Sequence, residues 1–285
     1  MHTVHQYRAA LPGIEAVSLH SDRQFPRHSH DQFGIGVITS GGHRSWSCIG
    51  WVNAVCGDMI MVNPGEIHDG YSLDGSARGW KMLFVEPELV HDIFNGEIQT
   101  HDVDLRPSVQ DRDQRTRFER LFHAVTTQKP ESLDIEECLL QTLSHAFLHH
   151  GSQRSSCLPA LPNVNKVVRL IDSEPQKSWS LEEMARIVGV SRFHFLRGFA
   201  RATGATPHAY LVQQRVRLAR RLLAAGIGLA QASIEAGFAD QSHMTRAFVR
   251  QFGATPARYR RALCDPRGRA ISFKTKRVLT KKLDP

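Results

Sequence analysis

The sequence is poor in cysteine and in long apolar runs, and both absences exclude classes of protein. The 285 residues include five cysteines: Cys48, Cys56, Cys138, Cys157 and Cys264. They form no Cys-x-x-Cys pair and no even framework, which indicates reduced thiols serving as buried filler. No apolar run approaches the roughly 18 residues of a membrane span, and the N-terminus lacks the apolar centre of a signal peptide. We therefore expect a cytoplasmic protein that does not interact with membranes.

Positive charge is scarce in the first part of the chain and abundant in the second. Residues 1–160 contain 13 Lys and Arg against 20 Asp and Glu, whereas residues 161–285 contain 23 against 8. The resulting net charges of −7 and +15 sum to the +8 of the whole chain. Such a local excess is typical of a surface that neutralises DNA phosphates. The chain length and the 41% apolar content are sufficient for two globular domains.

An internal repeat dominates the basic part. Residues 191–210, SRFHFLRGFARATGATPHAY, recur at a shift of 49 as residues 240–259, DQSHMTRAFVRQFGATPARY. Each copy has the pattern of a helix, a sharp turn and a second helix, because Ser180, Ser191 and Asp240 are helix caps and Gly189 suits a turn. A helix at about 208–225 joins the two copies, and residues 164–173 form a first helix.

The second helix of each copy has an outward face that suits the major groove of DNA. Helical spacing turns Phe195 and Phe199 inward, and Met244 and Phe248 at the matching places. The outward residues are Phe193, Leu196, Arg197 and Arg201 in the first copy, and Gln241, Ser242, His243 and Arg246 in the second. Arg can bond to guanine through two hydrogen bonds, and apolar groups can contact a thymine methyl. An outward Arg on one helix is equally typical of solvated surface, but the duplication favours two DNA-reading helices.

This stretch resembles the DNA-binding domain of the AraC/XylS family of bacterial transcription regulators. The matching signatures are the twin Gly-Ala-Thr-Pro-x-x-Tyr ends, Arg-x-x-x-Ala-x-x-Leu-Leu at 215–223, and Gly-Phe-x-Asp-x-Ser-x-x-x-Arg-x-Phe at 237–248. The resemblance implies base reading by Phe193, Leu196 and Arg197, and by Gln241, Ser242, His243 and Arg246. Leu196 departs from the polar residue that is common in the family.

Residues 25–85 have the pattern of short strands separated by turn residues. Strands are expected at 33–39, 45–49, 51–55, 59–62 and 80–85, a spacing that favours a sandwich or small barrel. Residues 57–68, GDMIMVNPGEIH, resemble the strand-turn motif of the cupin-type sensor barrel in the same family. The expected fold class is therefore α+β multidomain: a cupin-like barrel with a helical hairpin, then an all-α domain with two helix-turn-helix units joined by a long helix.

Three histidines are candidate ligand contacts in this barrel. His28 and His30 form a His-x-His pair on one strand face, and a cupin barrel brings a later histidine, His68, beside them. They could bind a metal ion, contact a small molecule or have a purely structural role. We favour a ligand contact without a metal or other cofactor, because the Glu that completes the cupin metal pattern is absent. The resemblance also implies ligand contacts at Trp80 and Met82, and these residue types indicate a pocket different from that for arabinose.

The remaining segments complete the expected domain organisation. Residues 1–110 form the sensor barrel, with an N-terminal arm at 1–24, and residues 111–150 form a helical dimerisation segment. Burial of that segment against its own barrel alone is the alternative. Residues 151–163 are a linker, 164–263 the DNA-binding domain, and 264–285 a basic tail without a folded element.

Three function classes are compatible with this organisation. The first is a DNA-binding transcription regulator, a homodimer on operator DNA controlled by a small-molecule effector, which contacts RNA polymerase if it is an activator. The second is a metal-dependent cupin enzyme fused to a DNA-binding domain. The third, alkyl-transfer DNA repair, needs an activated cysteine, and none of the five lies in such a motif. No Ser/His/Asp group, phosphate-binding Gly loop or carboxylate pair indicates catalysis, so we favour the regulator.

Overall fold

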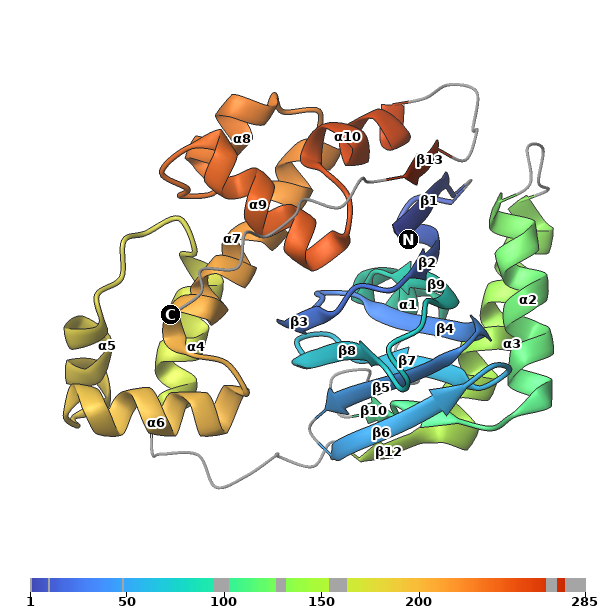
Figure 1. Ribbon diagram of the computed structural model, residues 1–285, viewed down its shortest axis with the longest axis horizontal. Coiled ribbons are helices and arrows are strands. Elements are labelled where there is room, and N and C mark those ends of the chain that lie inside the picture. Colours follow the sequence, from blue (N-terminus) through green and yellow to red (C-terminus); the bar gives the residue numbers. More distant parts are fainter. Residues whose placement is uncertain are drawn as a thin grey trace.

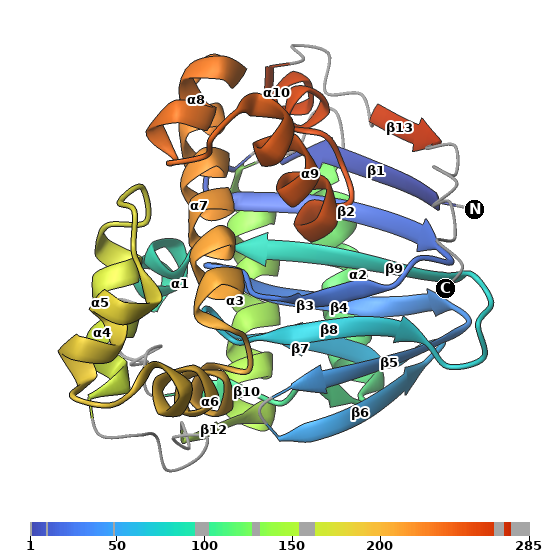
Figure 2. The same cartoon turned by 60° about the vertical axis from the view of Figure 1, so that its left-hand side comes forward.

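The computed structural model describes residues 2–9, 11–47, 49–94, 103–126, 132–153, 163–264 and 271–274. A β-rich N-terminal domain is followed by a helical C-terminal domain (Figures 1 and 2). Within the C-terminal domain, the long helix α7 (Pro207–Ala224) joins two groups of shorter helices. This order confirms the expected fold class.

Two sheets face each other in the N-terminal domain. The larger has the order β11-β7-β4-β9-β2-β1-β13 and consists of β1 (His2–Arg8), β2 (Ile14–Ser21), β4 (Phe33–Ser40), β7 (Met59–Val62), β9 (Arg78–Val85), β11 (Ser108–Val109) and β13 (Ile271–Lys274). The smaller has the order β3-β8-β5-β6 and consists of β3 (Phe25–His28), β5 (Gly42–Ser47), β6 (Gly50–Val55) and β8 (His68–Ser72). Among the described residues no strand ladder joins the two sheets, so the expected barrel is a cupin-like sandwich and not a closed cylinder.

Strand β9 shows how the larger sheet serves two cores. Its side chains alternate, so that Trp80 and Met82 face the smaller sheet while Leu83 and Val85 face the opposite side. Gly36 of β4 pairs with Met82, and a Cβ at Gly36 would lie 2.1 Å from the Met82 sulfur. Only glycine therefore leaves room for the Met82 side chain between the sheets.

Helices cover the outer face of the larger sheet. They are α1 (Pro87–Ile93), α2 (Arg112–Thr126) and α3 (Ser132–His150), and Figure 1 shows α2 and α3 side by side against the strands. Phe118 and Phe122 of α2 and Leu139 and Leu143 of α3 are buried in one cluster with the sheet. Most of the broad apolar arc of α3 is thus used within its own domain, and Leu140 and Leu148 stay exposed.

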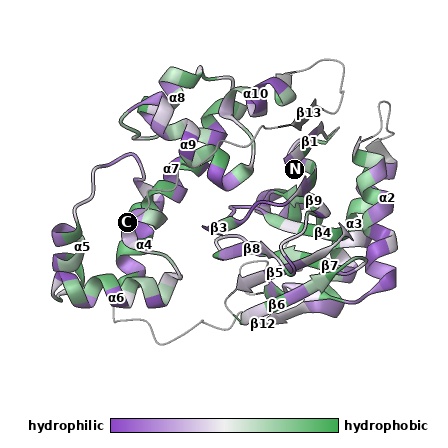
Figure 3. Ribbon diagram, in the orientation of Figure 1, coloured by the Kyte–Doolittle hydropathy of each residue, from purple (hydrophilic) through white to green (hydrophobic). Residues whose placement is uncertain are grey.

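The C-terminal domain has the expected double helix-turn-helix arrangement. Its helices are α4 (Val164–Ser173), α5 (Leu181–Val188), α6 (Arg192–Thr203), α7 (Pro207–Ala224), α8 (Leu229–Glu235), α9 (Gln241–Phe252) and α10 (Pro256–Cys264). Each carries both hydrophobic and hydrophilic residues (Figure 3), as helices with one buried face do. Two separate cores form, one around Phe195 and Phe199 and one around Met244 and Phe248.

Four sequence expectations are corrected by this structure. Residues 1–24 do not form a separate arm, because β1 and β2 extend the larger sheet and β2 pairs with β9 along its whole length. The first linker residues, Gly151–Gln153, are strand β12, which pairs with β10 (Val103–Leu105), while linker residues 154–162 lie outside the described residues. In the tail, Ile271–Lys274 form β13 beside β1 instead of an unfolded extension. Cys56 is exposed instead of buried filler, whereas Cys138 is buried.

Candidate DNA-binding face and ligand pocket

The first helix-turn-helix unit exposes the side chains expected to read DNA. The Ser180 side chain accepts a hydrogen bond from the Glu183 backbone N–H, and Gly189 ends α5 with φ 79°, which allows the sharp turn. On α6 the outward residues are all exposed: Phe193 (62%), Leu196 (37%), Arg197 and Arg201. The Arg197 guanidinium lies 5.5 Å from the Phe193 ring centroid.

The second unit repeats this arrangement with one difference. Asp240 caps α9 by accepting a hydrogen bond from the His243 backbone N–H, and Gln241, Ser242 and Arg246 are exposed. His243 is half-buried because its ring packs edge-on against Phe238 at 5.2 Å. His243 therefore offers less of its side chain to a groove than its three neighbours do.

The N-terminal domain holds both units at the same point of the repeat, the glycine that ends each reading helix. Arg27 donates a hydrogen bond to the Gly204 carbonyl (3.0 Å), and a ring nitrogen of His2 lies 3.2 Å from the Gly253 carbonyl oxygen. Trp46 lies against Gly204, and the Arg27 guanidinium stacks on the Trp46 ring at 4.1 Å. Both reading helices are thus anchored to the sensor by their C-terminal ends.

Arg220 of the connecting helix α7 forms the centre of the interface between the domains. Its side chain is 3% exposed and contacts three carboxylates of the N-terminal domain: Glu15, Asp31 (2.9 Å) and Glu86 (3.3 Å). Burial opposes the charged guanidinium, but these carboxylates outweigh burial and raise the pKa of Arg220 above its ordinary value. Because α7 carries both units, this cluster joins the sensor directly to the DNA-binding domain.

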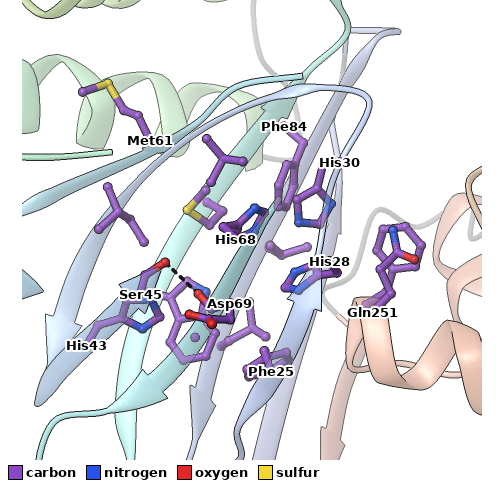
Figure 4. A pocket seen from close by; sticks show the side chains of 18 of the residues that line it. Phe25, His28, His30, His43, Ser45, Met61, His68, Asp69, Phe84 and Gln251 are labelled. Atoms are coloured by element: carbon purple, nitrogen blue, oxygen red, sulfur yellow. Dashed lines mark hydrogen bonds between the residues drawn. The ribbon is translucent and has the colours of Figure 1, made fainter. Parts of the chain in front are cut away.

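A pocket of about 130 Å³ lies between the two sheets and reaches the DNA-binding domain. All five residues expected to contact a ligand line it: His28, His30, His68, Trp80 and Met82. Sequence reasoning missed Phe25, His43, Ser45, Asp69 and Phe84 of the sensor, and Gln251, Phe252, Ala254 and Tyr259 of the DNA-binding domain. Figure 4 shows Gln251 approaching the histidines from a helix outside the sheets.

Hydrogen bonds fix the DNA-binding residues at the pocket. Gln251 donates to the Ser29 carbonyl (2.8 Å), and the Tyr259 hydroxyl donates to a Glu15 carboxylate oxygen (2.9 Å). Burial, followed by the charge of Glu15, raises the pKa of Tyr259, so the hydroxyl keeps its proton and can donate. No pattern within the helices marks these residues, because their partners lie in another domain.

The pocket histidines are uncharged. Burial lowers the pKa of His28 to about 4 and of His43 to about 3. Burial also lowers the pKa of His30 and His68 well below the ordinary value, and neighbouring imidazoles and Arg217 add to this effect. Arg78 donates a hydrogen bond from Nε to His43 Nδ1 (2.9 Å), so that nitrogen must be unprotonated. The pocket therefore offers neutral imidazoles within an apolar wall.

Arg27 lies beside the pocket, and its side chain does not line it. It lies instead 3.7 Å from the Asp69 carboxylate, which does line the pocket. Arg27 thus connects the pocket wall to the first helix-turn-helix unit.

Family models match both domains of the chain. The AraC-like ligand binding domain matches residues 11–143, and a helix-turn-helix domain matches residues 184–262. No helix among the described residues has the length and apolar character needed to cross a membrane.

Several similar proteins are named as transcription regulators. YbfI of Bacillus subtilis, an uncharacterized HTH-type transcriptional regulator, is 28% identical over 227 residues, which is 78% of this chain and 82% of YbfI. The virulence regulon transcriptional activator VirF of Yersinia enterocolitica is 32% identical over 142 residues, 49% of this chain and 50% of VirF. The crystal structure of ToxT from Vibrio cholerae has the same fold, with a TM-score of 0.56, 11% identity, and coverage of 90% of this chain and 100% of ToxT. The chain belongs to the AraC/XylS family of transcription regulators, with a ligand-binding domain joined to a double helix-turn-helix domain.

Proposed function

We propose that this regulator reads operator DNA with two sets of side chains and performs no catalysis. The sets are Phe193, Leu196, Arg197 and Arg201 on α6, and Gln241, Ser242, His243 and Arg246 on α9. The observation that carries the proposal is the pair of capped helices, on which all of these residues are exposed except the half-buried His243. Each helix is short enough to lie in one major groove, where Arg and Gln distinguish base pairs.

The regulator acts in the cytoplasm as a homodimer, according to this proposal. The exposed Leu140 and Leu148 of α3 are the apolar residues that a second copy would cover. VirF and ExsA, which resemble this chain, are named as a transcriptional activator and a transcriptional regulator. By analogy with VirF we favour an activator that contacts RNA polymerase.

The effector is a small molecule that binds in the pocket between the sheets. Trp80, Met82 and Phe84 supply an apolar wall, and the neutral imidazoles supply directional polar contacts. ToxT has been crystallised with an unsaturated fatty acid, which supports a ligand with an apolar body. Because Phe252 and Tyr259 also line the pocket, an effector contacts the DNA-binding domain directly and favours one arrangement of the two domains.

Base reading is tested by removing one arginine from each reading helix. We expect Arg197→Ala or Arg246→Ala to weaken binding to the DNA that the full chain selects by about 1–3 kcal/mol, roughly 5- to 150-fold, because a bond to a base edge is lost. Binding to random DNA should change little. Gel-shift titrations on both DNAs measure the two affinities.

The matched control is Arg186→Ala. Arg186 is exposed on α5 of the first unit and forms only a 3.5 Å ion pair with Glu182, so its loss removes the same charge without a base contact. If the three variants weaken binding to selected and random DNA equally, Arg197 and Arg246 contact phosphates and the assignment of base-reading residues is wrong.

A further inference from the structure

We propose that His28, His30 and His68 together bind one divalent transition-metal ion in the pocket. This proposal rests on the proposed function, because the metal ion would lie in the effector pocket. Binding of the effector does not itself require the metal ion. Sequence reasoning favoured no metal because the usual Glu after His-x-His is absent. Three imidazoles alone, however, make a complete set of protein ligands for a metal that keeps one open position.

The first observation is the distance between the rings. His28 at the end of β3 pairs with His68 at the start of β8, and His30 follows in the next loop. The ring centroids are 4.4 Å apart for His28 and His68, 5.0 Å for His28 and His30, and 5.2 Å for His30 and His68. One nitrogen of each lies within 4.8 Å of the others. A tetrahedral ion with bonds of about 2.0–2.1 Å needs nitrogens roughly 3.3 Å apart, so small ring rotations suffice.

The second observation is the position of the protons. His28 Nδ1 lies 2.7 Å from the Pro26 carbonyl oxygen, and His68 Nδ1 lies 3.1 Å from that of Glu66. A carbonyl only accepts hydrogen bonds, so each Nδ1 carries the proton and each Nε2 has a free lone pair. Metal-binding histidines in proteins characteristically have this backbone support, which fixes the ring and its tautomer.

The third observation is that these lone pairs have no donor. Within the described part of the chain, neither His28 Nε2 nor His68 Nε2 accepts a hydrogen bond, and His30 makes no side-chain hydrogen bond. His28 and His30 are only 8% and 6% exposed. The three imidazoles line the same pocket (Figure 4), and one metal ion there would be a shared partner for one nitrogen of each ring.

The surrounding charges permit a cation despite Arg217. Its guanidinium donates a hydrogen bond to the His30 carbonyl (2.8 Å) and lies close to the site. The carboxylates of Asp31 and Asp172 face Arg217 and offset its charge, and Asp69 lines the same pocket. Imidazole ligands suit zinc, copper, iron and nickel, and a fourth position remains for water or a donor atom of the effector.

The test is titration of the chelator-treated full chain with Co²⁺ and Zn²⁺. We expect one ion per chain at the pocket, with visible absorption from Co²⁺ bound to nitrogen ligands. His30→Ala and the more conservative His68→Gln should each weaken binding by more than about 100-fold, since loss of a supporting partner alone costs 10- to 100-fold. Circular dichroism of the metal-free variants shows whether they are folded, and His30→Ala and His68→Gln test the site separately.

Two controls separate this site from others. Asp111, His145 and His150 form a second group with possible ligand atoms within 4.8 Å, at the helical hairpin. A His145→Ala/His150→Ala variant and the exposed His208→Ala should retain the Co²⁺ absorption. Loss of the absorption only in the hairpin variant, or no stoichiometric binding by the full chain, overturns the proposal. Neither result affects DNA reading by Arg197 and Arg246 or the binding of an organic effector.

Discussion

Replacing Arg220 by alanine is expected to lower the free energy of unfolding of the full chain by about 3–5 kcal/mol. The change removes the buried cation and leaves Glu15, Asp31 and Glu86 close together, with the exposed Arg221 near Asp31 as the remaining cation of the cluster among the described residues. Breaking this ion cluster is costly because the three remaining like charges are largely shielded from water, at 18–33% exposure, and repel one another. Because Arg220 contacts both domains, its removal should mainly weaken the association between the two domains. Urea denaturation of the full chain measures it.

The neighbouring Arg221→Ala is the matched control. Arg221 is 57% exposed, and its ion pair with Asp31 spans 3.8 Å, so its removal should change the free energy of unfolding by less than about 1 kcal/mol. Equal destabilisation by the two substitutions would mean that the buried cluster does not hold the domains together. Small-angle scattering of Arg220→Ala provides a second measurement, because undocked domains have a larger radius of gyration.

Acid should destabilise the metal-free protein steeply between pH 6.5 and pH 4. His28 has a pKa of about 4, His43 of about 3, and His30 and His68 lie well below 6.5, all because of burial. The unfolded chain takes up these protons near pH 6.5 while the folded chain does not, so stability is lost as the pH falls. Each histidine contributes about 1.4 kcal/mol per pH unit well below pH 6.5.

Urea denaturation of chelator-treated protein at several pH values measures this slope. For His28 and His43 together we expect roughly 3 kcal/mol per pH unit between about pH 6 and pH 4, and the lowered pKa values of His30 and His68 add to this loss. His28→Gln should reduce the slope by about one proton, whereas the exposed His208→Ala should leave it unchanged. A stability that is constant from pH 7 to pH 5 would show that these imidazoles are not buried and neutral.

The helical domain could be predicted from sequence because its signals are local. Each helix cap accepts a hydrogen bond from the backbone N–H three residues later, as in Ser180, Ser191 and Asp240. The turn after α5 depends only on the left-handed backbone conformation of Gly189. The repeat then identified the matching residues of the second unit. Strands β1 and β2 gave no comparable signal. Both faces of β2 are covered, Ile14 and Ala16 by one core and Leu19 by the other, so no polar alternation marks it.

The interface between the domains could not be predicted, because its contacts join residues far apart in sequence. Tyr210 and Tyr259 occupy the same place in the repeat, yet Tyr210 donates to Asp172 within its own domain and Tyr259 donates to Glu15 of the sensor. The excess of positive charge in the C-terminal half was likewise only partly explained by DNA binding. Arg217 and Arg220 belong to the basic half, but they are buried between the domains and do not face DNA.

The most direct test of the account is selection of DNA from a random library by the full chain. The two capped helices α6 and α9, each exposing an arginine on its reading face, require DNA with two separate half-sites. We expect an enriched motif whose two half-sites have centres about 10 base pairs apart, so that successive major grooves face the protein. Enrichment of no motif, or of a single short half-site, would contradict sequence-specific reading by both units.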